Sequence, residues 1–177
     1  MHTFLLIALL SYVSIVCISD VVSHRIPNVL TVPAAATAMT LSVASHGLSG
    51  ALTSGAGLMV GLSLFLPFYL SGGFGAGDVK GLAAVGAFMG PYGVFLAALC
   101  TLIAGMVCGL GLLFVTGGWS AVRSMLGRWT FRAHVLFTTG RQAHIEADPG
   151  DPARRRFPYG FAIACGTAAS VMLTLTR

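Results

Sequence analysis

The sequence predicts an all-α protein that crosses a membrane several times. Its residues are 56% hydrophobic and only 8% charged, whereas soluble domains contain about 25% charged residues. The mean hydropathy is correspondingly high, at +0.88. Long apolar runs leave no room for a separate soluble domain, so we expect residues 1–177 to form a single domain in a lipid bilayer.

The apolar runs predict six membrane-spanning helices. Crossing about 30 Å of hydrocarbon takes about 20 residues, and each span must be helical because lipid offers no partners to backbone amides. The predicted spans are residues 3–19, 29–45, 52–71, 79–90, 93–116 and 158–176. The fourth has only twelve residues and reaches about 18 Å, so we expect it to begin below the membrane surface.

The basic residues predict the orientation of the chain in an inner (cytoplasmic) membrane. If the six spans alternate, nine of the ten Lys and Arg residues lie on one side, and seven of these are in the loop 117–157. Cytoplasmic loops of membrane proteins hold the excess of Lys and Arg. Both termini are therefore expected outside. The same pattern explains the net charge of +5 without any binding of nucleic acid.

The loop 117–157 is expected to hold an amphipathic helix in its first half. Apolar residues recur there at helical spacing, which predicts a helix lying on the cytoplasmic membrane face. The apolar face consists of Trp119, Val122, Met125, Leu126, Trp129, Ala133, Leu136 and Phe137. The second half, EADPGDPARRR, contains prolines and a glycine and predicts an exposed connection.

Two of the five acidic residues lie at membrane edges. Asp20 closes the first predicted span, Asp78 opens the fourth, and the predicted topology puts both at the cytoplasmic edge. The other three acids share the loop 117–157. An acid near hydrocarbon costs about 2.5 to 3.5 kcal/mol on insertion scales, so a functional role is the first hypothesis for each of the two.

The residues around these acids argue against several kinds of site. His24 is the one additional ligand nearby, which is too few for zinc, and no metal or cofactor is expected. The stretch GFGAGDVKG fits neither the dinucleotide nor the P-loop pattern. The four cysteines form no CxxC pair and are expected to act as small apolar side chains.

A pair of aspartates is sufficient for peptide hydrolysis. Two carboxylates about 3 Å apart in a low dielectric cannot both ionise, so one keeps a proton while the other polarises a water for attack on a carbonyl. Gly75 and Gly77 would allow unusual dihedrals beside Asp78 and let an extended peptide approach. The alternative is a glycine-rich turn with an incidental acid, and spacing alone does not decide between the two.

The sequence resembles the prepilin peptidases, membrane aspartyl proteases of the GxGD class in the type IV leader peptidase family. SDVVSHRIPN, which begins at residue 19, is similar to the family segment D-x(4)-R-I-P-N, and GFGAGDVK is similar to its GxGD segment. A weaker match is FPYGFAIACG, residues 157–166, which is similar to the opening of the family's last helix. The matched residues of the first segment are Asp20, Arg25, Ile26, Pro27 and Asn28.

The resemblance implies that Asp20 and Asp78 are the catalytic pair of an endopeptidase. Its substrate would be a type IV prepilin or pseudopilin precursor, whose short basic leader is cut from an apolar helix at the cytoplasmic membrane face. The compact form is similar to the subgroup serving tight-adherence (Flp) pili, and the archaeal preflagellin peptidases are an alternative. N-methyltransferase activity is not implied, since the sequence has no region with two CxxC pairs.

Other residues of the matching motifs are expected to support the site. Lys80 either acts on Asp78 or the substrate, or anchors the chain at the membrane surface, and Arg25 has the same alternatives. Pro27 and Asn28 are expected to start the second helix.

Two other classes of function are compatible with acids at the membrane edge. A non-enzymatic component of a pilus or secretion platform would use the acids to pair with Arg25 or Lys80. A small transporter would use them in a proton path, although no repeat is detectable in the sequence.

Overall fold

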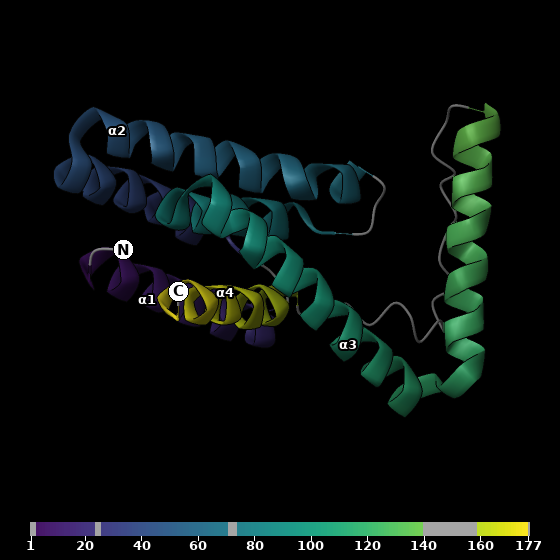
Figure 1. Ribbon diagram of the computed structural model, residues 1–177. Coiled ribbons are helices and arrows are strands. Elements are labelled where there is room, and N and C mark those ends of the chain that lie inside the picture. Colours follow the sequence, from purple (N-terminus) through teal and green to yellow (C-terminus); the bar gives the residue numbers. More distant parts are fainter. Residues whose placement is uncertain (1–2, 24–25, 71–73, 140–158, 177) are drawn as a thin grey trace. The chain divides into compact units, whose positions relative to one another are not determined.

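The computed structural model describes residues 3–23, 26–70, 74–139 and 159–176. These ranges contain four helices and no strand: α1 (Thr3–Ser23), α2 (Asn28–Leu70), α3 (Ala76–Thr139) and α4 (Tyr159–Leu175) (Figure 1). The predicted all-α class is confirmed.

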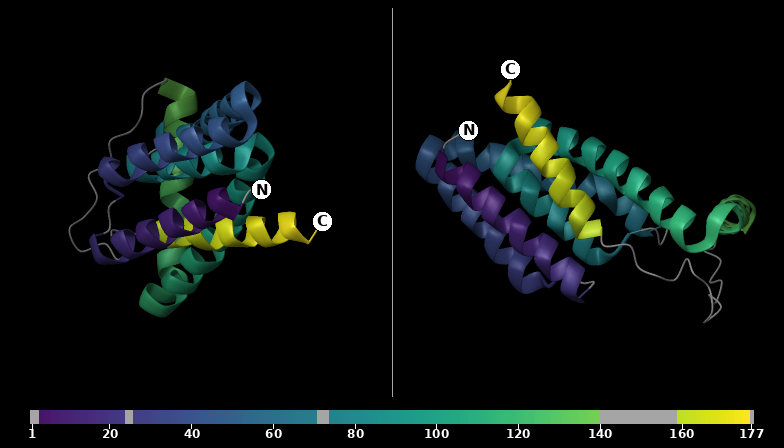
Figure 2. Two further views of the ribbon diagram at one scale, coloured as in Figure 1. Left: turned by 90° about the vertical axis from the view of Figure 1, so that its left-hand side faces the viewer. Right: turned by 90° about the horizontal axis from the view of Figure 1, so that it is seen from below.

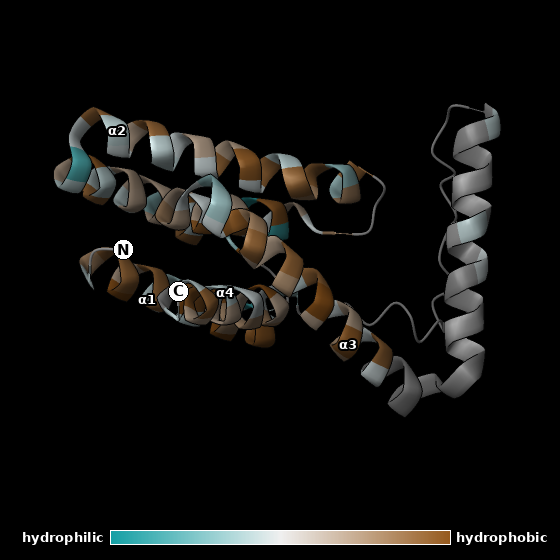
Figure 3. Cartoon of the chain, in the orientation of Figure 1, coloured by the Kyte–Doolittle hydropathy of each residue, from teal (hydrophilic) through white to brown (hydrophobic). Residues whose placement is uncertain are grey.

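The helices have the length and composition of membrane helices. Three of them, α1, α2 and the part of α3 up to Gly111, are long and apolar enough to span a bilayer, and α4 is a shorter apolar helix. Hydrophobic residues cover most of the ribbon in these segments (Figure 3). The protein is therefore a membrane protein.

The prediction of six separate helices is wrong, because two of the expected turns fall inside α2 and α3. Gly47, with φ 60° and ψ −138°, joins two helical segments within α2. Gly90 in α3 has φ 73° and is followed by Pro91. Gly47 lies in the gap predicted between the second and third spans, and Gly90 is the last residue of the predicted fourth span. Glycine adopts a positive φ at little cost because it has no Cβ.

The α2 helix folds back on itself at Gly47 (Figures 1 and 2). Its two segments come so close that a Cβ at Gly50 would overlap the carbonyl of Ser42. Asn28 and Leu70, the two ends of α2, therefore lie at the same end of the bundle (Figure 1).

The second segment of α2 packs antiparallel to the first segment of α3. A Cβ at Gly57 would overlap the carbonyl of Gly86, and one at Gly61 would lie 2.7 Å from the carbonyl oxygen of Leu82. This is the helix-packing role expected when small residues recur four positions apart.

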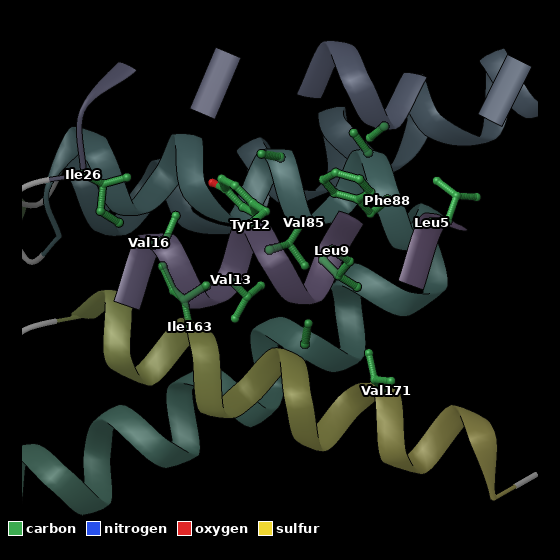
Figure 4. Packing of buried hydrophobic residues seen from close by; sticks show 14 residues of the cluster. Leu5, Leu9, Tyr12, Val13, Val16, Ile26, Val85, Phe88, Ile163 and Val171 are labelled. Atoms are coloured by element: carbon green, nitrogen blue, oxygen red, sulfur yellow. The ribbon is translucent and has the colours of Figure 1, made fainter. Parts of the chain in front are cut away.

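The main core consists mostly of residues of α1, α3 and α4, together with Ala38 of α2 (Figure 4). Tyr12 of α1 is buried there, stacks on Phe88 with a centroid distance of 6.2 Å, and donates a hydrogen bond from its hydroxyl to the Gly81 carbonyl at 3.3 Å. Ser170 of α4 donates to the carbonyl of Gly93 at 3.3 Å. These contacts tie α1 and α4 to the same part of α3.

The chain divides into two compact units, Met1–Gly105 with Pro158–Arg177, and Met106–Phe157. Residues 117–139, expected to hold an amphipathic helix, are helical, but they belong to α3 and do not form a separate helix. Their position at the membrane surface remains a prediction, as does the assignment of 1–177 to one domain. The predicted exposed connection EADPGDPARRR lies outside the described residues.

Candidate active site

Asp20 is a buried carboxylate in the last turn of α1. Its side chain is 5% exposed, and its Oδ2 accepts a hydrogen bond of 2.6 Å from the backbone N–H of Gly160. Gly160 is the second residue of α4, where N–H groups have no partner within their own helix. Asp20 therefore caps α4 through a residue that lies 140 positions later in the chain.

Asp78 is a buried carboxylate in the first turn of α3. It is 9% exposed, and its Oδ2 accepts a hydrogen bond of 2.9 Å from the N–H of Gly75. The N–H of Asp78 in turn donates to the carbonyl of Gly75 at 3.1 Å. This reciprocal pair resembles a capping box, with the acid three residues after the capping residue.

The structure brings Asp20 and Asp78 into one site. The two side chains are near enough that the charge of Asp20 acts on Asp78. Each carboxylate also lies at the amino end of a helix, where the partial positive charge of the helix favours an anion. Two acids that are 58 residues apart in sequence, 78 minus 20, thus share one environment, and their catalytic role remains a prediction.

The segment before α2 packs against the segment that carries Asp78. Ile26 is buried, and a Cβ at Gly77 would lie 3.0 Å from the Cβ and the carbonyl oxygen of Ile26. The helix α2 begins at Asn28, directly after Pro27, as the sequence predicted. The two motif segments are therefore in direct contact.

The glycines beside Asp78 provide space, not unusual dihedrals. Among the described glycines, a positive φ occurs at Gly47 and Gly90, so neither Gly75 nor Gly77 has one. A Cβ at Gly75 would lie 3.1 Å from Asp78 Oδ2. Small size is needed at these positions because a carboxylate and a neighbouring backbone occupy the space where side chains would be.

Lys80 links the same two motif segments at the surface. Its exposed side chain donates a hydrogen bond from Nζ to Asn28 Oδ1 at 3.0 Å. Lys80 therefore has a defined partner at the start of α2, which neither of its predicted roles included. Arg25 and His24 lie outside the described residues, and the alternatives given for Arg25 remain predictions.

An aromatic cluster adjoins the two carboxylates and was missed by the sequence analysis. Phe74 meets the ring of Tyr159 edge-on, with a centroid distance of 4.6 Å and an interplanar angle of 80°. Phe74 also stacks on Phe65 at 4.8 Å. The Tyr159 side chain lies close enough to Asp78 to be affected by its charge. The available signal was an aromatic residue directly before a glycine in both GFGAGD and FPYGF.

The described groups of the site that could hold a ligand include the carboxylates of Asp20 and Asp78. Within the described ranges, no group of three or more His, Cys, Asp or Glu residues lies close enough together to hold a metal ion. All four cysteines are in described helices and none of them forms a disulfide.

Comparison with known proteins identifies the family. The model of the Type IV leader peptidase family matches residues 6–110, more than half of the 177 residues, and this range includes Asp20 and Asp78. The chain belongs to the type IV leader peptidase family. As a member, it is a protease of the leader peptidase type. No curated protein and no solved structure gives a significant match.

The match of the type IV leader peptidase family ends before α4. Residues 6–110 do not reach Tyr159 and Gly160, whose contacts with Phe74 and Asp20 come from the structure. The site therefore extends beyond the part of the chain that the family comparison covers.

Proposed function

We propose that this family member is an aspartic endopeptidase in which Asp20 and Asp78 hydrolyse a peptide bond. The proposal is supported by one observation above all: two carboxylates from separate helices are both buried, and their backbone donors directly follow Tyr159 and Phe74, whose rings are in contact. Each has one oxygen held by a backbone N–H, from Gly160 for Asp20 and from Gly75 for Asp78. Groups fixed in this way need little reorganisation during reaction.

The two carboxyl groups would act as general base and general acid. The ionised carboxylate takes a proton from water, and the water oxygen bonds to the carbonyl carbon of the substrate. The protonated carboxyl group donates its proton to the carbonyl oxygen. When the tetrahedral intermediate collapses, the C–N bond breaks and the carboxyl group that took the proton from water gives it to the leaving nitrogen. The other carboxylate takes back the proton of the hydroxyl group as the carbonyl re-forms, which restores the starting state of the pair. Acid-base catalysis of this kind contributes about 100- to 10,000-fold in rate.

The substrate is proposed to be a prepilin or pseudopilin precursor, cut between its basic leader and its apolar helix. The family is that of the type IV leader peptidases, and both acids lie at the ends of apolar helices, where a leader joins a membrane segment. The resemblance to the GxGD proteases that serve tight-adherence (Flp) pili supports a precursor of the Flp type.

The site is proposed to face the cytoplasm, with six crossings and both termini outside. The 43 residues of α2 reach about 65 Å, roughly twice the thickness of the hydrocarbon core, and the chain turns at Gly47. The 36 residues from Ala76 to Gly111 reach about 54 Å, with Gly90 inside them. Two crossings each by α2 and α3, with α1 and α4, would make six.

Replacement of either aspartate tests the proposed chemistry. Asp20→Asn and Asp78→Asn keep the shape of the side chain and an oxygen that can accept the glycine N–H, but an amide cannot exchange the proton. We expect each variant to lose at least about 1,000-fold in cleavage rate. The measurement is leader release from a purified precursor with a basic leader, a glycine and an apolar helix, by the full chain in lipid nanodiscs.

The control is Asp148→Asn, an acid of the polar loop outside both motifs, which should cleave at the wild-type rate. Cleavage by Asp20→Asn or Asp78→Asn at a rate close to wild type would refute the aspartic mechanism. If the acids serve only a pilus or secretion platform, the double variant would instead lower the amount of assembled complex in cells and leave leader cleavage intact.

A further inference from the structure

The hydrogen-bond donors of the two aspartates share a local pattern. Asp78 is held by the N–H of Gly75, which follows Phe74, and Asp20 is held by the N–H of Gly160, which follows Tyr159. The two aromatic rings are themselves in contact, edge to face, at 4.6 Å. A continuous path therefore runs from one carboxylate to the other through two amides and two rings.

Both ends of this path are anchored in the fold. Phe74 stacks on Phe65 at 4.8 Å, and its N–H donates to the carbonyl of Phe68 at 3.4 Å. Phe65 is 1% exposed, so it gives the Phe74 ring a fixed support on α2. At the other end, a Cβ at Gly160 would lie 2.6 Å from the Cβ of Asp20, so α4 touches Asp20 directly.

The path also has the geometry needed to set the distance between the two carboxylates. Each ring is connected to the following N–H by a few covalent bonds of one backbone, so a shift of the ring moves the donor that holds the carboxylate. Edge-to-face contacts between rings favour a defined orientation. A misplacement of about 1 Å in a catalytic group costs on the order of 100-fold in rate.

We propose that the contact between Phe74 and Tyr159 is a positioning device that sets the separation of Asp20 and Asp78. The two rings are positioning residues: they act on the carboxylates through the amides of Gly75 and Gly160. The catalytic consequence depends on the proposed aspartic mechanism, whereas the mechanical link between the two amides does not.

The kinetic test uses the full chain in nanodiscs and the precursor described above. Phe74→Leu and Tyr159→Leu keep an apolar side chain but remove the edge-to-face contact. We expect kcat to fall by on the order of 100-fold in each, with KM within about threefold of wild type. Tyr159→Phe keeps the ring and should restore kcat to within about threefold.

Two further readouts separate positioning from general damage. If both rings act through one contact, their effects should not add. The kcat of the double variant should then be no more than about threefold below that of the less active single variant. A greater separation of the carboxylates weakens their coupling, so the bell-shaped pH profile of kcat should narrow in the Leu variants. Phe68→Leu, in the same cluster at 5.3 Å from Phe74 but not followed by a glycine, is the matched control and should change neither property.

Hydrogen exchange followed by mass spectrometry tests the link without any catalysis. Phe74→Leu should accelerate exchange in the peptide that contains Gly160 by at least about tenfold, and Tyr159→Leu should do the same for the peptide that contains Gly75. Phe68→Leu should leave the Gly160 peptide unchanged. This reciprocal effect is expected even if the chain cuts no prepilin.

The outcomes distinguish the two proposals. If wild type fails to cleave the precursor, or the Asn variants of the aspartates still cleave it, the proposed function is wrong and the exchange data alone decide the link. If wild type cleaves normally, the positioning role is overturned by any of three results: additive losses in the double variant, an equal loss in Phe68→Leu, or no reciprocal change in exchange.

Discussion

At the scale of single residues, the absence of a side chain at position 160 is as informative as the carboxylate beside it. A Cβ there would lie 2.6 Å from the Cβ of Asp20 and 2.8 Å from its Oδ2, both far inside van der Waals contact. Only glycine lets α4 approach closely enough for its N–H to hold Asp20 at 2.6 Å.

Gly160→Ala should therefore lower the rate of cleavage more than it lowers the stability of the fold. The added methyl group must push Asp20 away from its donor, and we expect cleavage of the precursor to fall by on the order of 100-fold. The measurement is kcat/KM together with the thermal unfolding midpoint in the same detergent.

Gly105→Ala is the matched control for this substitution. A Cβ at Gly105 would meet Tyr159 at 3.5 Å and Ala162 at 3.7 Å, which are ordinary contacts on the same helix, α4. Both changes place alanine in a helix, where it is favoured over glycine by about 1 kcal/mol. Equal activity of the two variants would contradict the steric role assigned to Gly160.

The sequence identified the two acids but not the aromatic residues that adjoin them. Asp20 and Asp78 stand out because the chain has only five acids and a charge in an apolar run has a large energetic cost. Phe74 is one of eleven phenylalanines, and an aromatic residue in an apolar protein needs no special explanation. Its proximity to Tyr159 follows only from the way the helices pack.

At the scale of elements, the contact between α2 and α3 depends on two facing glycines. A Cβ at Gly57 would overlap the Gly86 carbonyl, and a Cβ at Gly86 would overlap the Gly57 carbonyl. Close backbones also allow Ser54 to donate from its hydroxyl to the Ala87 carbonyl at 2.8 Å. Since lipid gives no hydrophobic drive for helix association, such close packing supplies much of the stability.

Gly57→Ala should separate these helices and destabilise the protein. Overpacking costs about 1 to 3 kcal/mol, which outweighs the gain in helix propensity of about 1 kcal/mol over most of that range. We expect a lower midpoint of thermal unfolding in detergent. Gly55→Ala, where a Cβ would meet only Met39 at 3.8 Å, should unfold at or slightly above the wild-type temperature. The packing role would be disproved by the same midpoint in both variants.

Hydropathy predicted where the helices lie better than where they end. The first and last predicted spans, 3–19 and 158–176, correspond to Thr3–Ser23 and Tyr159–Leu175. The turns at Gly47 and Gly90 were located, but a single glycine with positive φ reverses or bends the chain without a loop. The end of the fifth predicted span is different: α3 continues past residue 116 to Thr139, because a change in polarity does not require a helix to stop.

At the scale of the whole molecule, the unit that contains the site has two different ends. One end holds the last turn of α1 and the first turns of α2, α3 and α4, with Asp20, Asn28, Asp78 and Gly160. The other end holds the two positive-φ glycines, where a Cβ at Gly90 would lie 3.0 Å from Thr53 Cγ2. The two buried aspartates thus lie at one end of this unit and the two positive-φ glycines at the other.

The difference between the two ends predicts which residues a reagent can reach from each side of the cell membrane. In a chain whose four cysteines are replaced by alanine, Ser49→Cys should react with an impermeant maleimide added to intact cells. Ser23→Cys should react only after the membrane is opened, because the proposed orientation puts the basic loops and the site end in the cytoplasm. Both serines are exposed in the structure. The reverse labelling pattern would contradict the proposed orientation.

The hydrogen bond between Gly160 and Asp20 also has a consequence during translation. Asp20 is made early, but its amide donor is made 140 residues later, after every other part of the described site. Until α4 has been translated and inserted, a nascent chain holds both acids without the donor that fixes the first of them. The protein is thus built in an order that completes the Asp20 site last.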